Sequence, residues 1–117
     1  MTEKPVEWVG SSLADVRRFP DDARRRAGFE LQAVQHGAMP SDSRPMPSVG
    51  AGVTEIRIRT GTEHRIFFIA KFEEAVYVLH AFEKKTQKTA KRDIELGRAR
   101  LAEVLASRSA STKRRKQ

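Results

Sequence analysis

The alternation of apolar and charged residues in residues 53–59, VTEIRIR, constrains the fold of this chain most. Its two isoleucines, at positions 56 and 58, fall on one parity, while Arg57 and Arg59 fall on the other. Successive side chains of a β-strand point to opposite faces of the sheet, so this pattern is typical of a half-buried strand. The segment is therefore predicted to lie in a sheet with one apolar face and one arginine-bearing face.

Gly61, which lies between two threonines, predicts a hairpin turn into a second strand over residues 65–72. If the isoleucines of the first strand share a face with Ile66 and Phe68, the loop must contain an odd number of residues. A three-residue loop with Gly61 in a left-handed conformation fits this condition best. The register then gathers three cations on the other face: Arg57, Arg59 and Arg65.

The flanking segments predict a third strand and several helices. The strand is expected over residues 76–82. A short helix ending at Phe19 and a longer one between Pro20 and Gly37 should form a helical hairpin against the sheet, and a last helix is expected over residues 90–106. The longer helix of the hairpin has an apolar stripe, which comprises Ala23, Ala27, Leu31 and Val34.

Three other segments have less regular patterns. Residues 5–9 are expected to form a short edge strand. Residues 38–52 contain three prolines and two glycines, which is typical of an irregular surface loop, with a functional flap as the alternative. Residues 107–117 are polar and basic without periodicity, so they are predicted to be a disordered tail that follows a single domain over residues 1–106.

The chain of 117 residues has no cysteine, so one domain without disulfides is expected. No apolar run approaches the roughly 20 residues of a membrane span, and the N-terminal residues lack the apolar core of a signal peptide. These features predict a cytoplasmic protein with no membrane contact.

The net charge of +8 is confined to the second part of the chain. Residues 1–50 hold 7 basic and 7 acidic residues, while residues 51–117 hold 16 basic and 8 acidic ones. A localised basic surface favours a polyanion such as nucleic acid, because binding releases counterions. A charge excess that serves only solubility is the alternative.

The residues suit phosphodiester chemistry that needs no metal. The three histidines have no ligand-like spacing, and no phosphate-binding glycine motif is present. RNA cleavage by the neighbouring 2′-hydroxyl requires a proton acceptor, cations around the phosphorane and a proton donor. His80 suits either proton role, and a purely structural histidine is the alternative. Phe68 and Phe82 could stack on bases, although aromatic residues at strand spacing are more often core residues.

Three successive segments, EIRI, HRIFFI and VYVLHAFEKKTQKT, resemble the RelE/ParE toxin superfamily, specifically its phage-derived HigB-like branch. The resemblance implies an α+β fold in which an N-terminal helical hairpin packs on a small twisted antiparallel sheet, with a C-terminal helix. It also implies the toxin of a type II toxin–antitoxin pair. Such a toxin cleaves mRNA in the ribosomal A site without metal or cofactor, and a cognate antitoxin blocks it.

The resemblance also implies roles for individual residues. The residues in catalytic positions are Arg57, Arg65, His80 and Lys84. The residues in RNA-binding positions are Arg59, Lys85, Phe68 and Lys88. The chain departs from the family pattern because Ala90 lies near the position of a tyrosine and Phe68 stands where relatives often carry one; both departures favour His80 for proton transfer. Glu55 is a weaker candidate, either to orient Arg57 or to act as a base.

Two other functions remain compatible with the same scaffold. One is a ParE-like poison of DNA gyrase, since the fold does not fix the chemistry. The other is a non-catalytic relative that only binds an antitoxin or nucleic acid. Under the leading hypothesis, Arg65→Ala should relieve growth arrest while leaving the fold intact.

Overall fold

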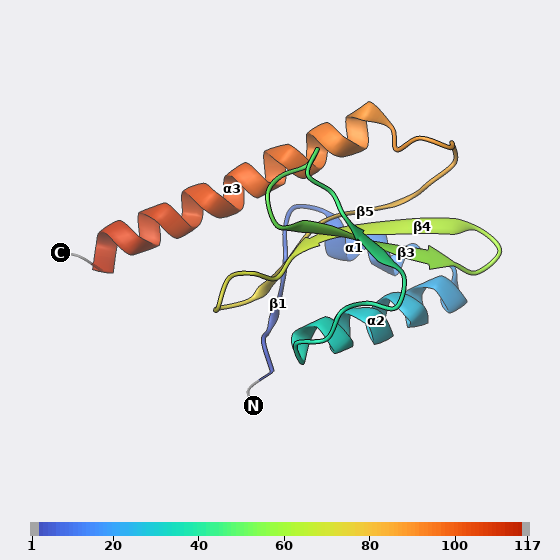
Figure 1. Ribbon diagram of the computed structural model, residues 1–117, viewed down its shortest axis with the longest axis horizontal. Coiled ribbons are helices and arrows are strands. Elements are labelled where there is room, and N and C mark those ends of the chain that lie inside the picture. The colour runs from blue at the N-terminus through green and yellow to red at the C-terminus, as the bar shows by residue number, and fades with distance from the viewer. Residues whose placement is uncertain (1–2, 116–117) are drawn as a thin grey trace.

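A five-stranded sheet lies between helices on both of its faces in the computed structural model, which describes residues 3–115, with side chains described as far as Ser111 (Figure 1). In chain order the elements are β1 (Val6–Trp8), α1 (Ser12–Arg17), α2 (Asp21–Gln35), β2 (Ser43–Pro45), β3 (Val53–Arg59), β4 (Glu63–Ile69), β5 (Val76–Glu83) and α3 (Lys91–Arg115). The strand order in the sheet is β1-β5-β4-β3-β2. The predicted α+β class, with a helical hairpin first and a helix last, is confirmed.

The predicted hairpin register is confirmed at the turn between β3 and β4. Arg59 pairs with Glu63, which leaves a three-residue loop, and Gly61 in that loop has a φ of 103°. Only glycine adopts such a backbone conformation without strain. Two residues farther from the loop on each strand, Arg57 pairs directly with Arg65. The hairpin therefore brings the predicted arginines onto one face.

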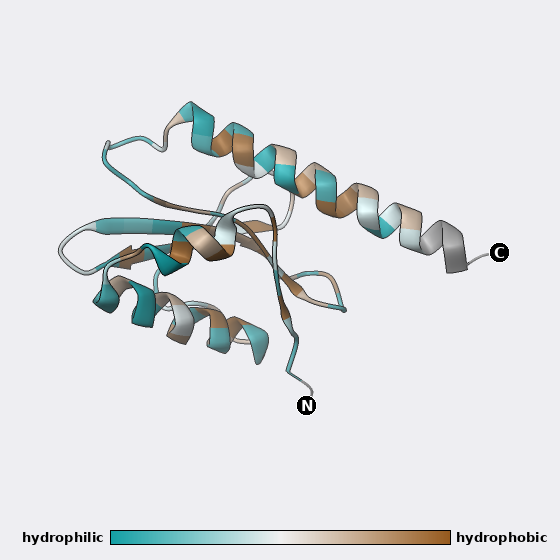
Figure 2. Cartoon of the chain, turned by 180° about the vertical axis from the view of Figure 1, so that it is seen from behind, coloured by the Kyte–Doolittle hydropathy of each residue, from teal (hydrophilic) through white to brown (hydrophobic). Residues whose placement is uncertain are grey.

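Two apolar cores form, one on each face of the sheet. The isoleucines of β3, together with Ile66 and Phe68, pack against α1 and α2. The predicted stripe of α2 is buried there, and this helix alternates apolar and polar residues along its length (Figure 2). On the other face, Phe67, Ile69 and Leu79 pack against α3.

Gly97 sets how closely α3 approaches the sheet. A Cβ atom at this position would lie 3.0 Å from side-chain atoms of both Phe67 and Val49. Contacts this short force the neighbouring atoms to move, so the glycine permits a close helix–sheet approach.

Two strand assignments differ from expectation. The sheet is mixed, because β1 runs parallel to β5, with Val6 opposite Val76. The long stretch of chain between β1 and β5, which includes α1, α2 and three strands, provides the crossover connection that parallel pairing requires. In addition, residues 43–45, which were expected to be irregular, form the edge strand β2. β2 pairs antiparallel with β3, and Pro45 is tolerated because edge strands have one unpaired side.

The last helix is longer than expected. It was predicted to end at residue 106, but α3 continues to Arg115, so the predicted helix end is wrong. Residues 116–117 of the predicted tail lie outside the described part. Arg108 holds the extension, because its Nε lies 2.6 Å from Glu74 Oε2 and its guanidinium lies 3.8 Å from the ring centre of Phe72. The segment also contains no helix-breaking proline or glycine.

Arg108→Ala is expected to raise the pKa of Glu74. Hydrogen bonds from Arg108, the largest cause, and from Tyr77 lower that pKa from 4.5 to about 2. Because the carboxyl is more acidic in the folded state, the pair stabilises the fold above about pH 4.5, and this contribution is lost as the pH falls toward 2. An NMR titration of the Glu74 carboxyl measures the shift, with Arg92→Ala as the control. An unchanged Glu74 titration in Arg108→Ala would contradict the assigned contact.

Candidate nucleic-acid interface

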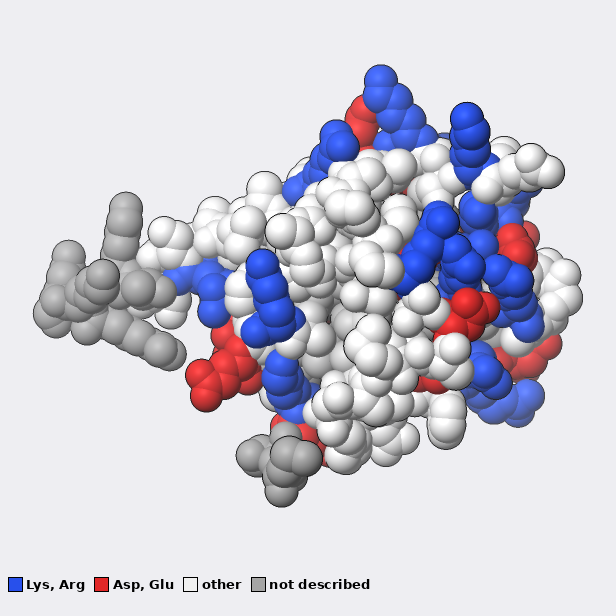
Figure 3. All heavy atoms as spheres, in the orientation of Figure 1, with Lys and Arg blue, Asp and Glu red and all other residues white. Residues whose placement is uncertain are grey.

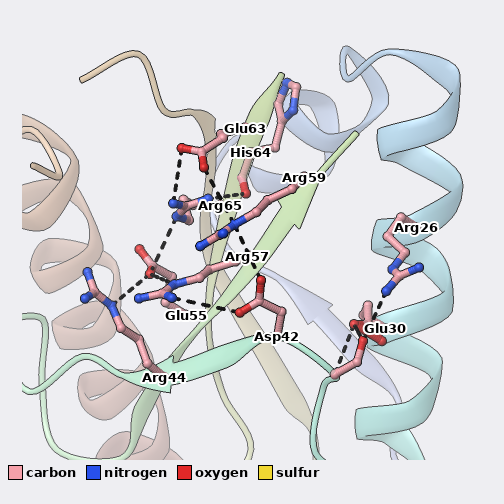
Figure 4. Close-up of polar contacts among 11 residues, drawn as sticks. Arg26, Glu30, Asp42, Arg44, Glu55, Arg57, Arg59, Glu63, His64 and Arg65 are labelled. Carbon is pink, nitrogen blue, oxygen red and sulfur yellow. Dashed lines mark hydrogen bonds and ion pairs between the residues drawn. The ribbon is translucent and has the colours of Figure 1, made fainter. Parts of the chain in front are cut away.

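Three arginines surround one buried carboxylate on the face of the sheet opposite α1 and α2 (Figure 4). Glu55 of β3 is 0% exposed. Arg44 of β2 pairs with Glu55 across the two strands. Two residues after Glu55 on β3, Arg57 pairs with Arg65 of β4. Alternation along the strands therefore directs all these side chains to the same face.

A single oxygen atom of Glu55 faces three of the arginines. Its Oε1 lies 3.1 Å from Arg44 Nε, 3.5 Å from Arg57 Nε and 3.6 Å from Arg65 Nε. A buried carboxylate needs such partners, because taking a charge out of water is costly. Glu55 therefore lies within ion-pair distance of three guanidinium groups and accepts a hydrogen bond from Arg44. Among the described residues, Arg57 Nε, Arg65 Nε and Glu55 Oε2 have no hydrogen-bond partner.

Arg65 is buried more deeply than expected. Its side chain is 3% exposed, its Nη2 lies 3.5 Å from Glu63 Oε2 and its Nη1 donates to the carbonyl oxygen of His64. Burial lowers the pKa of Arg65, although the charges of Glu55 and Glu63 raise it. The expectation that Arg65→Ala leaves the fold intact is not supported, because the substitution removes a buried ion-pair partner.

Arg57 and Arg59 are the more accessible of the three predicted arginines, with side chains 24% and 54% exposed. Asp42 lies 3.9 Å from Arg57 Nη1 and 3.5 Å from Arg59 Nε, and Glu63 lies 3.6 Å from Arg59 Nε. Lysine and arginine side chains gather over the end of the molecule where β3 turns into β4 (Figure 3). This end presents cations to solvent.

His80 forms a hydrogen-bonded pair with Asp93 in the first turn of α3. Its Nε2 lies 2.8 Å from Asp93 Oδ1, and its ring stacks on Phe82 with centroids 4.9 Å apart. The histidine is 5% exposed, and its Nδ1 has no hydrogen-bond partner among the described residues. Asp93 was missed in the sequence, where the only available signal was an acidic residue at a predicted helix N-terminus.

The structure separates His80 from the arginines. Arg57 pairs with Arg65, which pairs with Phe82 across the next strand. His80 lies two residues before Phe82 on β5 and pairs with Phe67 of β4. Two strand spacings, or about 10 Å, therefore separate the strand of Arg57 from that of His80. The predicted proton-transfer residue and the predicted cations share a face without direct contact.

A groove of 960 Å³ runs beside the second half of β5, between the end of α1 and the first half of α3. Its lining includes Phe19, His64, His80, Phe82, Asp93 and Leu96. His64 approaches it from the α1 side, with its ring 4.3 Å from that of Phe19. Burial lowers the pKa of His64, against the charges of Glu83 and Asp22.

His64→Gln is expected to flatten the pH dependence of stability between about pH 7 and pH 5. Because the pKa of His64 is lowered on folding, the unfolded chain binds this proton more tightly, and the free energy of unfolding should fall as the pH drops below 6.5. Urea denaturation at several pH values measures this slope. The control is His36→Gln, which changes an exposed histidine. A wild-type slope in His64→Gln would contradict the assignment.

The predicted catalytic residue Lys84 and the other predicted RNA-binding residues differ in accessibility. Lys84 is half-buried, and its backbone N–H donates to the Glu63 carbonyl oxygen, while Lys85 and Lys88 are exposed in the connection to α3. Phe68 is 3% exposed and lies in the core beneath α2. Its role as a base-stacking residue is corrected, because the ring has no free face for a base.

Known sequences identify the family of this chain. Residues 14–102 match the family described as phage derived protein Gp49-like (DUF891). No curated protein matches the chain. In the described residues there is no helix long and apolar enough to span a membrane. The matched region covers most of the chain and includes every strand from β2 to β5. The chain therefore belongs to the phage-derived Gp49-like family, a member of the RelE/toxin-like family.

Proposed function

We propose that this protein is the toxin of a type II toxin–antitoxin pair, of the HigB-like branch, and a ribosome-dependent mRNA endonuclease that needs no metal. The observation that carries this proposal is the arginine cluster around buried Glu55. Preorganised cations stabilise a phosphorane more effectively than mobile ones, because they need no reorganisation during the reaction. A cognate antitoxin and mRNA in the ribosomal A site are the proposed partners.

The proposed site has two parts: the cations that bind RNA phosphates, and His80 with its partner Asp93. Arg57 and Arg59 contact the scissile phosphate or its neighbours. Arg65, which is buried, helps to position Arg57 because both pair with Glu55. Lys84, Lys85 and Lys88 extend the basic surface toward α3. His80, oriented by Asp93, transfers a proton once the bound RNA spans both parts.

Inducible expression without the neighbouring antitoxin gene tests this function. Transcript ends are mapped by primer extension in a translated message and in the same message without a start codon. Cuts confined to the translated message are expected. Growth arrest with intact transcripts would contradict mRNA cleavage and favour a gyrase poison. The absence of both arrest and cleavage would favour a binding-only relative, which would accord with the burial of His80.

A further inference from the structure

Arg44 was not predicted as a site residue, yet the structure places it in the arginine cluster. It lies on β2, in the proline-containing segment, and its Nε donates to Glu55 Oε1 at 3.1 Å. Arg57 approaches the same oxygen through its own Nε at 3.5 Å (Figure 4). One buried carboxylate oxygen thus faces the Nε atoms of two arginines from neighbouring strands, with a hydrogen bond from Arg44 and an ion pair to Arg57.

This arrangement leaves the outer ends of both guanidinium groups available. Among the described residues, the terminal nitrogens of Arg44 have no hydrogen-bond or ion-pair partner, and those of Arg57 have only Asp42, at 3.9 Å. The two side chains are 46% and 24% exposed. Free guanidinium edges fit the oxygens of a phosphate through paired N–H donors.

The charges at Glu55 also favour an anion. Four arginines (Arg44, Arg57, Arg59 and Arg65) face three carboxylates (Asp42, Glu55 and Glu63), so the group carries one net positive charge. Arg65, which is 3% exposed, already provides Glu55 with a buried partner.

We propose that Arg44 and Arg57 form a two-arginine clamp for an RNA phosphodiester, and that Glu55 is the positioning residue that orients both. Arg44 is then a phosphate-binding residue contributed by the segment between α2 and β3. The clamp rests on the proposed function for its RNA ligand. It adds a phosphate contact and a means of orientation to the basic surface.

The clamp is tested by the salt dependence of RNA binding. Binding of the full chain to a fluorescein-labelled single-stranded RNA is followed by fluorescence anisotropy over a series of salt concentrations. Loss of one phosphate contact in Arg44→Ala should weaken binding and reduce the slope of log affinity against log salt by about one. Arg25→Ala makes the same charge change on α2, on the other side of the sheet, and should retain the wild-type slope.

Glu55→Gln separates positioning from simple neutralisation, because the two roles predict opposite signs. If Glu55 only neutralises the cluster, removal of its negative charge should tighten RNA binding. If it orients the clamp, binding should weaken even though the site becomes more positive. Circular dichroism establishes that the variant is folded at the assay temperature. Arg44→Lys, which retains the charge on the segment that carries Arg44 but lacks the planar guanidinium, should recover only part of the lost affinity.

The outcomes distinguish the clamp from the proposed function. RNA binding that depends on Arg44 and Glu55 in a protein that cuts no transcript would support the clamp and reject the endonuclease. Cleavage by wild-type protein, with unchanged binding in Arg44→Ala and Glu55→Gln, would overturn the clamp and leave the endonuclease standing. Wild-type protein without salt-dependent RNA binding would also overturn the clamp. If Glu55→Gln does not fold, Arg44→Ala with its Arg25→Ala control decides the result.

Discussion

Arg57→Ala should lower the rate of mRNA cleavage by about 10²–10³-fold, the cost of removing one preorganised donor from a developing anion. Arg57 is the predicted cation that combines partial exposure with a fixed position, since Glu55 and Asp42 hold two sides of its guanidinium. The fold should persist, because Arg44 and Arg65 remain as partners of Glu55.

The rate loss is measured as single-turnover cleavage of a message on purified ribosomes, together with growth after induction in cells. Arg25→Ala is the matched control, because it removes an exposed arginine from α2, away from the cluster. Both proteins should give similar yields of folded material. A folded Arg57→Ala protein that cleaves at the wild-type rate would exclude Arg57 from the reaction.

Phe67→Ala should reduce the free energy of unfolding by about 3–5 kcal/mol, the usual cost of truncating a fully buried phenylalanine. Phe67 is 0% exposed, forms an edge contact with Phe82 at 5.2 Å and lies against Gly97 of α3. Its ring also lies 6.0 Å from that of His80. The substitution should therefore loosen α3 and disturb the His80–Asp93 pair as well as the core.

Urea denaturation of wild type and variant gives the difference in stability. Phe29→Ala is the matched control, because Phe29 is 64% exposed on α2 and its truncation should change stability by no more than about 0.5 kcal/mol. Hydrogen exchange of α3 amides provides a second measurement. Equal stability losses in the two variants would show that Phe67 does not hold α3 on the sheet.

The hairpin could be predicted from the sequence because its determinants are local. Period-two alternation fixed the faces of β3 and β4, and Gly61 between two threonines fixed the loop. The pairing of Arg57 with Arg65 followed from these two facts alone. The buried stripe of α2 was equally local, since helical spacing identifies the face that packs on the sheet.

The rest of the site depends on pairings between distant segments. Arg44 joins the cluster only because β2 pairs with β3, and Asp93 meets His80 only because α3 crosses that face of the sheet. Alternation predicts which face carries Arg65, but not that neighbouring residues bury it to 3% exposure. The length of α3 was missed because Arg108 finds its partner Glu74 in another part of the fold.

Cleavage of a defined message by purified protein tests the central claim most directly. The protein is added to purified ribosomes programmed with a message that presents a chosen codon in the A site, and to the same message without ribosomes. We predict a cut within the A-site codon that leaves a 2′,3′-cyclic phosphate, in the ribosome-bound message alone. An intact message under both conditions, or equal cleavage without ribosomes, would contradict this account.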